Sequence, residues 1–515
     1  MPICKILAAV ALAAGLCCAI PAQAQSPIVH TASGDLAGSG GDIRAFKGVP
    51  YAAPPIGPLR WRPPEPIAPW TGVRDATRFG ADCMQKPLAD SRAPGVSEDC
   101  LTLNIWAPAQ APQQRLPVMV WVYGGGFVEG SASLPLYDGE ALARKGVVLI
   151  TLNYRTGVFG FLAHRALAAE SPQHSAGNYG VLDVIEALRW IKQNIGAFGG
   201  DLDRVTIFGE SAGASILDMV LVSPLSEGLM QRAILESPGA MRPLSTLPEA
   251  EAIADVAGPD LAVLRAMPAS EVLALNGKIV PPVRHLTTPR ALGPIRDGWV
   301  VPRTDTEAFA SGLMRKVPLI VGGNSDEGRA FVKDWPIHTG AEARSYAEQN
   351  FGGSADAVMS LYRFDSDASV KPALAYAFGD TQFNYGVRGL ARGMSAVQPK
   401  TWRYLFTHAP AGETIAPTHS EEIDYVFGNF GAPRWVPRGK MNAADRQLSD
   451  AMMEAWVRFA ATGDPNGGNL PRWPAYDAVS DPYLEFGDAI AVGHNYRTPY
   501  LDFVQGFLTS LHAAN

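Results

Sequence analysis

Short apolar runs separated by amphipathic stretches follow one another along most of this chain. The runs at residues 118–122, 147–152, 205–208, 317–321 and 402–406 end in Gly, Asn or polar residues. Each run is too short for a helix, and such runs are typical of strands that are buried on both faces of a sheet. Because helical stretches alternate with them, the pattern predicts an α/β fold with a large, mostly parallel central sheet flanked by helices.

Two of the intervening stretches have clear helical periodicity. In residues 181–195, apolar residues recur at three-residue spacing from Leu182 to Ile191, so we expect an amphipathic helix with its apolar face on the sheet. Residues 448–461 also predict a helix, which should cover one edge of the sheet. It should begin near Ser449 or Asp450 and end before Gly463 and Pro465.

The remaining segments bear on domain organisation. Residues 26–111 are rich in Gly and Pro and contain only short strand-like pieces such as 43–46, which predicts irregular β structure and loops. We find no repeat, no low-complexity tract and no long linker, so residues 25–515 are predicted to form a single domain with insertions.

The first residues resemble a targeting segment. Lys5 precedes an unbroken apolar run at residues 6–20, and Ala22-Gln23-Ala24 fits a cleavage site, so residues 1–24 are interpreted as a signal peptide. A membrane anchor is the less favoured interpretation because the run stops at Pro21, well short of the ~20 residues of a spanning helix. The order of residues before Cys17 and Cys18 also disfavours a lipid anchor.

Removal of this leader would leave only Cys83 and Cys100, an even pair in an oxidising compartment, so we predict one disulfide. The chain contains no Asn-x-Ser/Thr acceptor, which favours a bacterial periplasmic or secreted protein over a eukaryotic one. The net charge of −7 and the pI near 5.8 give no attraction for nucleic acid or anionic membranes. We expect a small-molecule partner, and the sequence leaves the oligomeric state open.

The most informative motif is Gly209-Glu210-Ser211-Ala212-Gly213. It follows the predicted strand at 205–208 and precedes a helical stretch at 212–222, which is the context of a nucleophile elbow. A sharp strand-to-helix turn leaves room only for Gly two residues before and after the nucleophile. The helix start supplies free N–H groups beside developing negative charge. Ser211 is therefore the candidate nucleophile.

A second Gly-rich turn, Tyr123-Gly124-Gly125-Gly126-Phe127, follows the strand at 118–122, and its N–H groups can converge on an oxyanion. A serine nucleophile also needs a His base that is oriented by a carboxylate. Asp326 and Glu327 follow the strand at 317–321; Glu327 is our choice and Asp326 the alternative. For the base, spacing alone does not separate His408 from His419.

With these motifs, the chain resembles the type-B carboxylesterases, a family of α/β-hydrolases that includes cholinesterases and many bacterial esterases. The likeness spans nearly all of the chain after the leader. Further matching segments are 46–52 (FKGVPYA), 98–104 (EDCLTLN), 153–155 (NYR), 177–178 (GN) and 462–466 (TGDPN).

The resemblance implies an α/β-hydrolase fold and assigns roles that the spacing left open. It makes Ser211 the nucleophile, Glu327 the acid and His419 the base of a catalytic triad. It implies further features: an oxyanion hole from the N–H groups of Gly125, Gly126 and Ala212, a Cys83–Cys100 disulfide, and an Arg60–Glu98 salt bridge.

One departure from the family concerns the first disulfide loop, where cholinesterases place a Trp that holds the quaternary ammonium. Residues 84–99 contain no aromatic residue and carry Lys86 and Arg92, so we do not expect a choline ester. These charges either favour an anionic ester or are solvated, and we favour the second interpretation.

The sequence therefore predicts a hydrolase of small to medium carboxylic esters that acts through an acyl-enzyme intermediate. The alternatives are an inactive binding or adhesion member of the same fold, and a thioesterase or amidase. Because the His residues are scattered and this chemistry needs no cofactor, we expect no metal and no cofactor. Insert loops at residues 241–300 and 331–394 should shape the substrate pocket.

Overall fold

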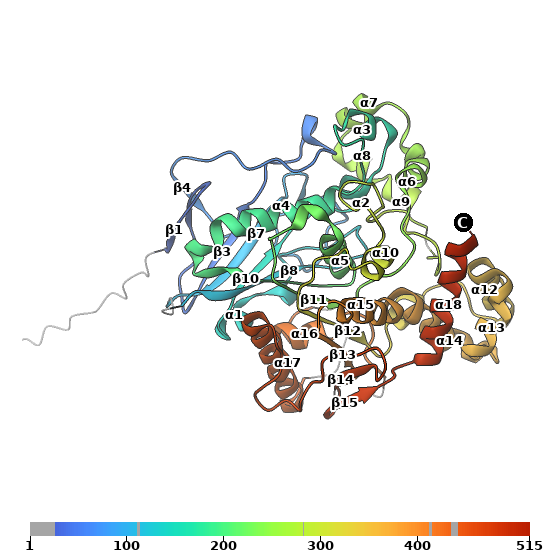
Figure 1. The fold of residues 1–515 in the computed structure, drawn as a ribbon. Helices are drawn as coiled ribbons and strands as arrows, with labels where there is room; N and C mark the ends of the chain where they lie inside the picture. The colour runs from blue at the N-terminus through green and yellow to red at the C-terminus, as the bar shows by residue number, and fades with distance from the viewer. Residues whose placement is uncertain (1–25, 111–113, 282, 411–414, 434–440, 515) are drawn as a thin grey trace, which may run out of the picture.

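A ten-stranded sheet forms the centre of the computed structural model, which describes residues 26–110, 114–281, 283–410, 415–433 and 441–514 (Figure 1). The strand order is β15-β14-β13-β12-β11-β10-β8-β9-β7-β3. The seven strands from β14 to β9 are parallel, and β15, β7 and β3 are antiparallel to their neighbours. The strands are β3 (Ile43–Pro50), β7 (Thr102–Pro108), β8 (Leu116–Val122), β9 (Val148–Leu152), β10 (Gly200–Glu210), β11 (Arg232–Glu236), β12 (Leu319–Asn324), β13 (Thr401–Phe406), β14 (Pro482–Phe486) and β15 (Ile490–His494).

Helices cover both faces of this sheet, which confirms the predicted α/β-hydrolase architecture (Figure 1). On one face α5 packs on β10 and β11, α15 packs on β12 and β13, and α4 packs on α5; on the other, α17 packs on β8 and β10. Between these layers the apolar side chains of β8, β9 and β10 are buried, as expected for strands without a solvent face. The helices are α1 (Glu140–Arg144), α4 (Tyr179–Asn194), α5 (Ala212–Val222), α10 (Asp305–Ala310), α15 (Tyr385–Ser395), α16 (Ile423–Phe427) and α17 (Ala443–Thr462).

Three details of the predicted elements are wrong. The helix expected at 448–461 begins at Ala443, because the Asn442 side chain caps it and accepts bonds from the N–H groups of Ala444 and Asp445. This helix, α17, lies against central strands and not against a sheet edge. The region 26–111, expected to be irregular, contributes β3 and β7 to the main sheet.

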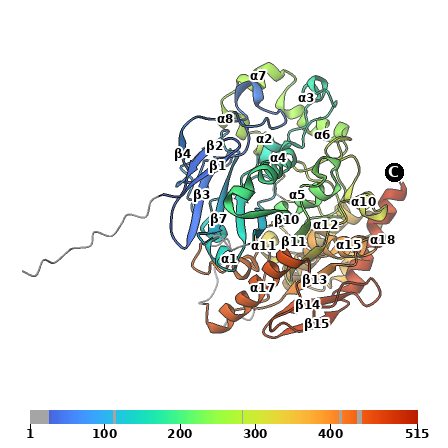
Figure 2. The same cartoon turned by 60° about the vertical axis from the view of Figure 1, so that its left-hand side comes forward.

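The N-terminal region also forms a small three-stranded sheet beside β3 and a two-stranded sheet of β5 (Asp82–Cys83) and β6 (Val96–Ser97). The strands of the three-stranded sheet are β1 (Ile28–Thr31), β2 (Gly34–Ala37) and β4 (Val73–Asp75), and Figure 2 shows them next to the outer end of the main sheet. A β-bridge from Ser39 to Ala45 links the three-stranded sheet to the main sheet. The Gly and Pro residues that suggested loops therefore lie among short strands.

A helical insert lies to the right of the main sheet in Figure 1, and residues 380–384, which follow it, contact β12. Its helices form a second apolar core around Trp335, Phe351 and Phe378, against which Phe503 and Phe507 of the C-terminal helix also pack. They are α12 (Gly340–Phe351), α13 (Ala355–Leu361), α14 (Asp367–Gly379) and α18 (Thr498–Ala514). This insert occupies much of the segment 331–394 that was expected to shape the pocket.

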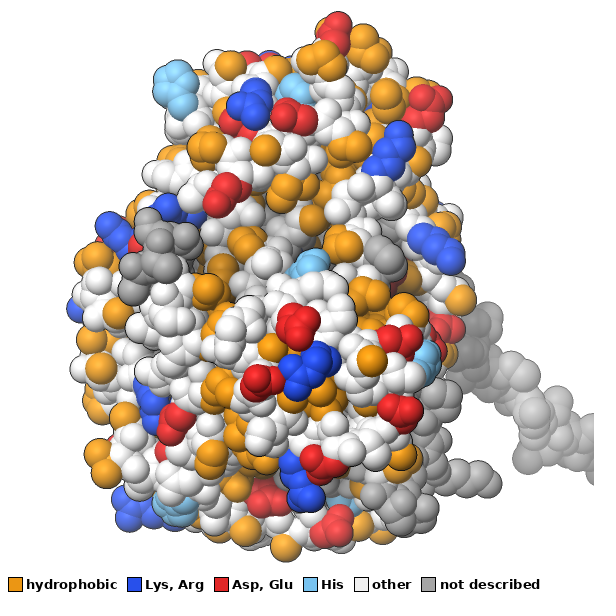
Figure 3. Space-filling view, turned by 90° about the vertical axis from the view of Figure 1, so that its right-hand side faces the viewer, with side chains coloured by type: hydrophobic (Ala, Val, Ile, Leu, Met, Phe, Trp, Pro, Cys, Tyr) orange, Lys and Arg blue, Asp and Glu red, His pale blue; other side chains and the backbone are white. Residues whose placement is uncertain are grey.

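The signal peptide expected at residues 1–24 lies outside the described residues. Within the described ranges, no helix combines the length and hydrophobicity that a membrane span requires. On the face drawn in Figure 3, acidic and basic side chains are dispersed and do not gather in a patch of one sign.

Candidate active site

Ser211 lies in the turn between β10 and α5, and its backbone is strained there. It has a φ of 56° and a ψ of −122°, values that a residue other than Gly rarely adopts. Its N–H donates to the carbonyl of Glu236 at 2.9 Å, which ties the turn to the neighbouring strand β11. A Cβ on either Gly209 or Gly213 would collide with the carbonyl oxygen of Val122. The motif's glycines are therefore required by the close approach of β8.

The second Gly-rich turn follows β8 and faces the same region. Gly125 and Gly126 have φ values of 112° and 62°, and the Gly125 carbonyl accepts the N–H groups of Val128 and Glu129 at 3.2 Å. A Cβ on Gly124 would approach the Cβ of Ser211 to 2.9 Å. The backbone of this turn therefore lies directly against the elbow, beside the first N–H groups of α5, which have no partner within the helix.

His419 and Glu327 meet through a short hydrogen bond. The His419 Nδ1 lies 2.6 Å from Glu327 Oε2, and both side chains are buried. The other oxygen of Glu327 accepts the N–H of Asn324 and the hydroxyl of Ser237, each at 2.6 Å. Since the loops that carry the two residues are joined by a β-bridge from Asp326 to Thr418, the backbone itself sets this approach.

The alternative candidates lie elsewhere. The Asp326 carboxylate pairs with Arg329 Nε at 2.8 Å and does not bond to His419. His408, at the end of β13, lies between Asp445 and Asp488, at 2.9 and 2.8 Å. It does not line the cavity that Ser211 and His419 share.

That cavity brings the candidate nucleophile and the candidate base together. It holds about 460 Å³ and is bounded by Ser211, His419 and the turn at residues 124–126. Leu88, Ala89 and Asp90 border it as well, so the loop closed by the Cys83–Cys100 disulfide forms part of its wall. Of the two cations expected in that loop, Lys86 is exposed and Arg92 pairs with Asp138 at 2.8 Å.

A group of buried glutamates surrounds His419. Glu210 Oε1 lies 3.0 Å from His419 Nε2 and accepts the hydroxyl of Ser420 at 2.5 Å. Burial by itself would lower the pKa of His419, but the charges of Glu210 and Glu327 outweigh it and raise this pKa to about 10. The two carboxylates on either side of the ring therefore favour its protonated, imidazolium form.

Glu422, three residues after His419 and directly before α16, completes this group. Asn324 Nδ2 donates to its Oε2 at 2.5 Å. Burial, and then repulsion from Glu210 and Glu327, raise the pKa of Glu422 to about 8. This raised pKa favours the protonated form of Glu422, which limits the negative charge around the imidazole.

Aromatic rings fix the imidazole from the side of the helical insert. The ring centres of Phe331 and Phe383 lie 5.0 and 4.3 Å from that of His419. Both residues come from the segment 331–394, so the insert contacts the site directly.

The predicted Arg60–Glu98 salt bridge is also present. It joins the first disulfide loop to the N-terminal region with N···O distances of 2.5 and 2.7 Å.

The comparisons with known proteins agree with this geometry. The model of the carboxylesterase family matches residues 25–504. The chain belongs to the carboxylesterase family.

Three relatives cover most of the chain and are themselves esterases. Fumonisin B1 esterase of Sphingopyxis macrogoltabida is 47% identical over 92% of this chain and 90% of its own length. Human cocaine esterase is 35% identical over 93% and 91%, and para-nitrobenzyl esterase of Bacillus subtilis (strain 168) is 34% identical over 84% and 89%. This chain is accordingly a serine carboxylesterase, an enzyme that acts on carboxylic esters.

Several residues around the site of this carboxylesterase escaped the sequence interpretation. Glu210 was visible as the variable residue of the elbow motif, and Glu422 three residues after His419, but neither had a recognised partner in the sequence. Ser237 carries no motif and reaches Glu327 through the pairing of β11 with β12, and Asn324 reaches it from the end of β12, three residues before Glu327. Among the described residues, no cluster of His, Cys, Asp and Glu could hold a metal ion.

Proposed function

We propose that this carboxylesterase hydrolyses small to medium carboxylic esters through a triad of Ser211, His419 and Glu327. The observation that carries the proposal is the convergence of three features on one cavity. These are the strained elbow at Ser211, the 2.6 Å bond between His419 and Glu327, and the Gly-rich turn at 124–126. Each supplies one of the groups that acyl transfer by serine needs.

In the first step Ser211 Oγ attacks the ester carbonyl carbon while His419 Nε2 takes the hydroxyl proton. The electron pair of the C=O bond moves onto oxygen, where the N–H groups of Gly125, Gly126 and Ala212 stabilise the negative charge. Collapse of this intermediate expels the alcohol, which takes the proton back from His419, and leaves an acyl-serine. Water repeats the sequence, releases the acid and restores Ser211.

The glutamates around the ring support the charged stage of this cycle. An imidazolium between Glu327 and Glu210 corresponds to the state in which His419 has accepted a proton. Glu327 holds Nδ1, so it fixes the ring and stabilises its positive charge. Glu210 raises the affinity of Nε2 for a proton, and we expect it to set the pH at which the base becomes available.

The cellular location of the enzyme is also a proposal. We place the mature enzyme in the periplasm or outside the cell, following the interpretation of residues 1–24 as a signal peptide. The Cys83–Cys100 disulfide supports this placement because such bonds persist in oxidising compartments.

The test is a rapid-mixing experiment with p-nitrophenyl butyrate at enzyme concentrations near 10 µM, roughly a stoichiometric range for burst detection. If acylation outruns deacylation, the wild type releases one equivalent of p-nitrophenol per site before steady turnover; otherwise hydroxylamine trapping reveals the acyl-enzyme. Ser211→Ala should show neither and should lose about three to six orders of magnitude in turnover. Near-normal hydrolysis by a folded Ser211→Ala variant contradicts the proposal.

A further inference from the structure

Three arginines from one insert segment lie near one another, and one of them, Arg284, lines the cavity; we call Arg242, Arg284 and Arg290 the arginine cluster. Arg242 is buried, with 7% of its surface exposed, and the other two are half-buried. Burial, and then the charge of Arg284, lower the pKa of both Arg242 and Arg290. The three positive charges therefore lie close enough to repel one another.

Two members of the cluster flank the catalytic turn. A methyl group placed on Gly126 would lie 3.1 Å from Arg284 Nη2, and Arg284 lines the cavity together with Ser211. The guanidinium of Arg290 lies 5.5 Å from the ring centre of Phe127, the residue that follows Gly126. Arg284 thus lies beside the proposed oxyanion hole, and Arg290 contacts the residue that follows it.

Arg290 also reaches the far side of the elbow. Its Nη2 would lie 3.9 Å from a methyl group on Gly239, whose N–H donates to Ser215 Oγ at 2.9 Å. Ser215 Oγ in turn donates to the carbonyl of Ser211 at 2.9 Å. Arg284 is therefore positioned to contact a substituent of a bound ester, and Arg242 and Arg290 add positive charge close to it.

The cluster is set apart by its missing counter-charges. Among the described residues none of its members forms an ion pair, and its one side-chain hydrogen bond runs from Arg242 Nη2 to the Thr288 carbonyl at 3.3 Å. Elsewhere in the fold, buried arginines have carboxylate partners: Arg155 with Asp183 at 2.7 Å, and Arg403 with Asp481 at 2.8 Å.

The nearest acids do not neutralise the cluster. Glu129 is exposed and attracts Arg284 without forming an ion pair. The buried Asp305 accepts the N–H of Met241 and interacts with the buried Asp218. Burial raises the pKa of both aspartates, which weakens them as counter-charges for the cluster. Because partly desolvated charges without partners are costly, the arrangement is typical of a site that awaits an anion.

We infer that the arginine cluster binds an ionised carboxylate carried by the substrate, so that the preferred esters bear a second, free carboxyl group near the scissile bond. This inference rests on the proposed ester hydrolysis at Ser211. Guanidinium groups suit this role because their planar N–H forks match the two oxygens of a carboxylate. The positive charge that would bind this carboxylate comes from the segment 241–300 and not from Lys86 or Arg92 of the disulfide loop.

Matched esters test the inference. Monomethyl glutarate is compared with its neutral counterpart dimethyl glutarate for an anion on the acyl side, and 4-acetoxybenzoate with 4-acetoxybenzamide for one on the alcohol side. We expect the wild type to prefer the anion in at least one pair by ~10-fold or more in kcat/KM, a ratio typical of charge-assisted bonds. Preference for the neutral ester in both pairs would overturn the inference.

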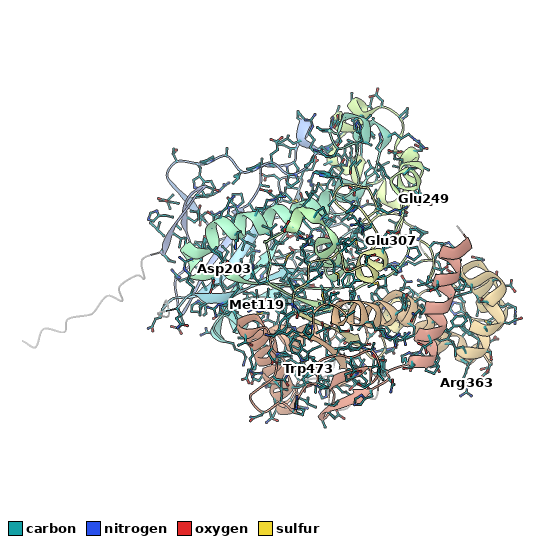
Figure 4. All side chains as sticks on the ribbon, viewed as in Figure 1. Met119, Asp203, Glu249, Glu307, Arg363 and Trp473 are labelled. Carbon is teal, nitrogen blue, oxygen red and sulfur yellow. A yellow bond between two sulfur atoms is a disulfide. The ribbon has the colours of Figure 1, made fainter. Side chains whose placement is uncertain are left out.

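Arginine variants assign the preference to the cluster. Arg284→Gln and Arg290→Gln should each reduce the anion-to-neutral ratio by ~10-fold or more, and Arg290→Lys should reduce it less, because the charge remains without the fork. The matched control is Arg363→Gln. Arg363 is exposed at the outer side of the helical insert, as Figure 4 shows, and its loss should leave the ratio unchanged. Ratios that stay at the wild-type value in both cluster variants contradict the assignment.

A binding measurement separates failure of this inference from failure of the proposed function. Glutarate, but not glutaramide, should raise the melting temperature of the wild type, and Arg290→Gln should abolish the effect. Stabilisation by glutarate without any ester turnover would refute the proposed hydrolysis and keep the anion site. Turnover of neutral esters with neither stabilisation nor anion preference would refute the anion site alone.

Discussion

Two buried histidines of this enzyme each lie between two carboxylates, and they differ in position and in the exposure of one partner: Asp488 beside His408 is exposed, whereas both carboxylates beside His419 are buried. His408 lies between Asp445 and Asp488 at 2.9 and 2.8 Å, and His419 lies between Glu327 and Glu210 at 2.6 and 3.0 Å. Only His419 shares a cavity with Ser211. A histidine with two carboxylate partners is thus no sign of catalysis by itself; access to a nucleophile distinguishes the two sites.

The largest expected effect concerns the two rings directly. His419→Gln should lower kcat/KM for p-nitrophenyl butyrate by about three to six orders of magnitude, because Ser211 loses its base. His408→Gln should change kcat/KM by less than about fivefold, since surface and structural sites contribute little to the transition state. Comparable losses in two folded variants would show that the positions do not differ as proposed.

The neighbouring carboxylates extend the comparison to the acid. Glu327→Gln should reduce kcat by about three to four orders of magnitude, because an amide cannot stabilise the imidazolium. Asp326→Asn, which removes the partner of Arg329, is the matched control and should stay within about fivefold of the wild type. Steady-state kinetics on both variants would contradict the account if Asp326→Asn were the more damaging change.

For stability we expect the opposite order: His408 should matter for folding although it does not matter for catalysis. His408 bonds to Asp445, which also accepts the hydroxyl of Tyr425 at 2.8 Å, at the start of α17. Loss of the ring leaves part of a buried carboxylate unpaired, so His408→Ala should lower the free energy of unfolding by about 1–3 kcal/mol. Urea denaturation measures this, and an unchanged midpoint would remove the structural role assigned to His408.

The smallest expected effect is a shift in pH dependence. The charge of Glu210 raises the pKa of His419, so the wild type gains its neutral base only as the pH rises through that pKa. Glu210→Gln removes this charge, and the rise of kcat/KM should move to lower pH. Glu348→Gln, a change at an exposed position of α12, is the control. A rise at unchanged or higher pH in Glu210→Gln would show that Glu210 does not set the pKa.

Some features of the site depend on short stretches of chain and others on distant packing, and this difference explains what the sequence could predict. The elbow at Ser211 and the turn at 124–126 are local, since their glycines are required by neighbouring backbone and leave a visible spacing. The strands at 118–122, 205–208 and 402–406 were likewise found within a few residues of their observed bounds. These parts depend on short stretches of chain and were therefore accessible.

The remaining features depend on long-range packing. The start of α17 was missed because its cap, Asn442, lies before the apolar pattern begins. β11, which carries Ser237 at its end, was not recognised, and the bond from Ser237 to Glu327 joins residues far apart in the chain. The arginine cluster escaped for the same reason, since nothing in the segment 241–300 indicates that its charges face Gly126 and Phe127. The choice of His419 over His408 came from the family resemblance and not from spacing.

The most direct test of the catalytic role of Ser211 is intact-mass analysis after incubation with a fluorophosphonate. We expect a single adduct that peptide mapping places on Ser211, with loss of p-nitrophenyl butyrate hydrolysis in proportion to labelling, and no adduct in His419→Gln under the same exposure. A folded wild-type enzyme that stays unlabelled while it hydrolyses the ester, or that is labelled at another residue, would contradict the assignment of Ser211 as the nucleophile.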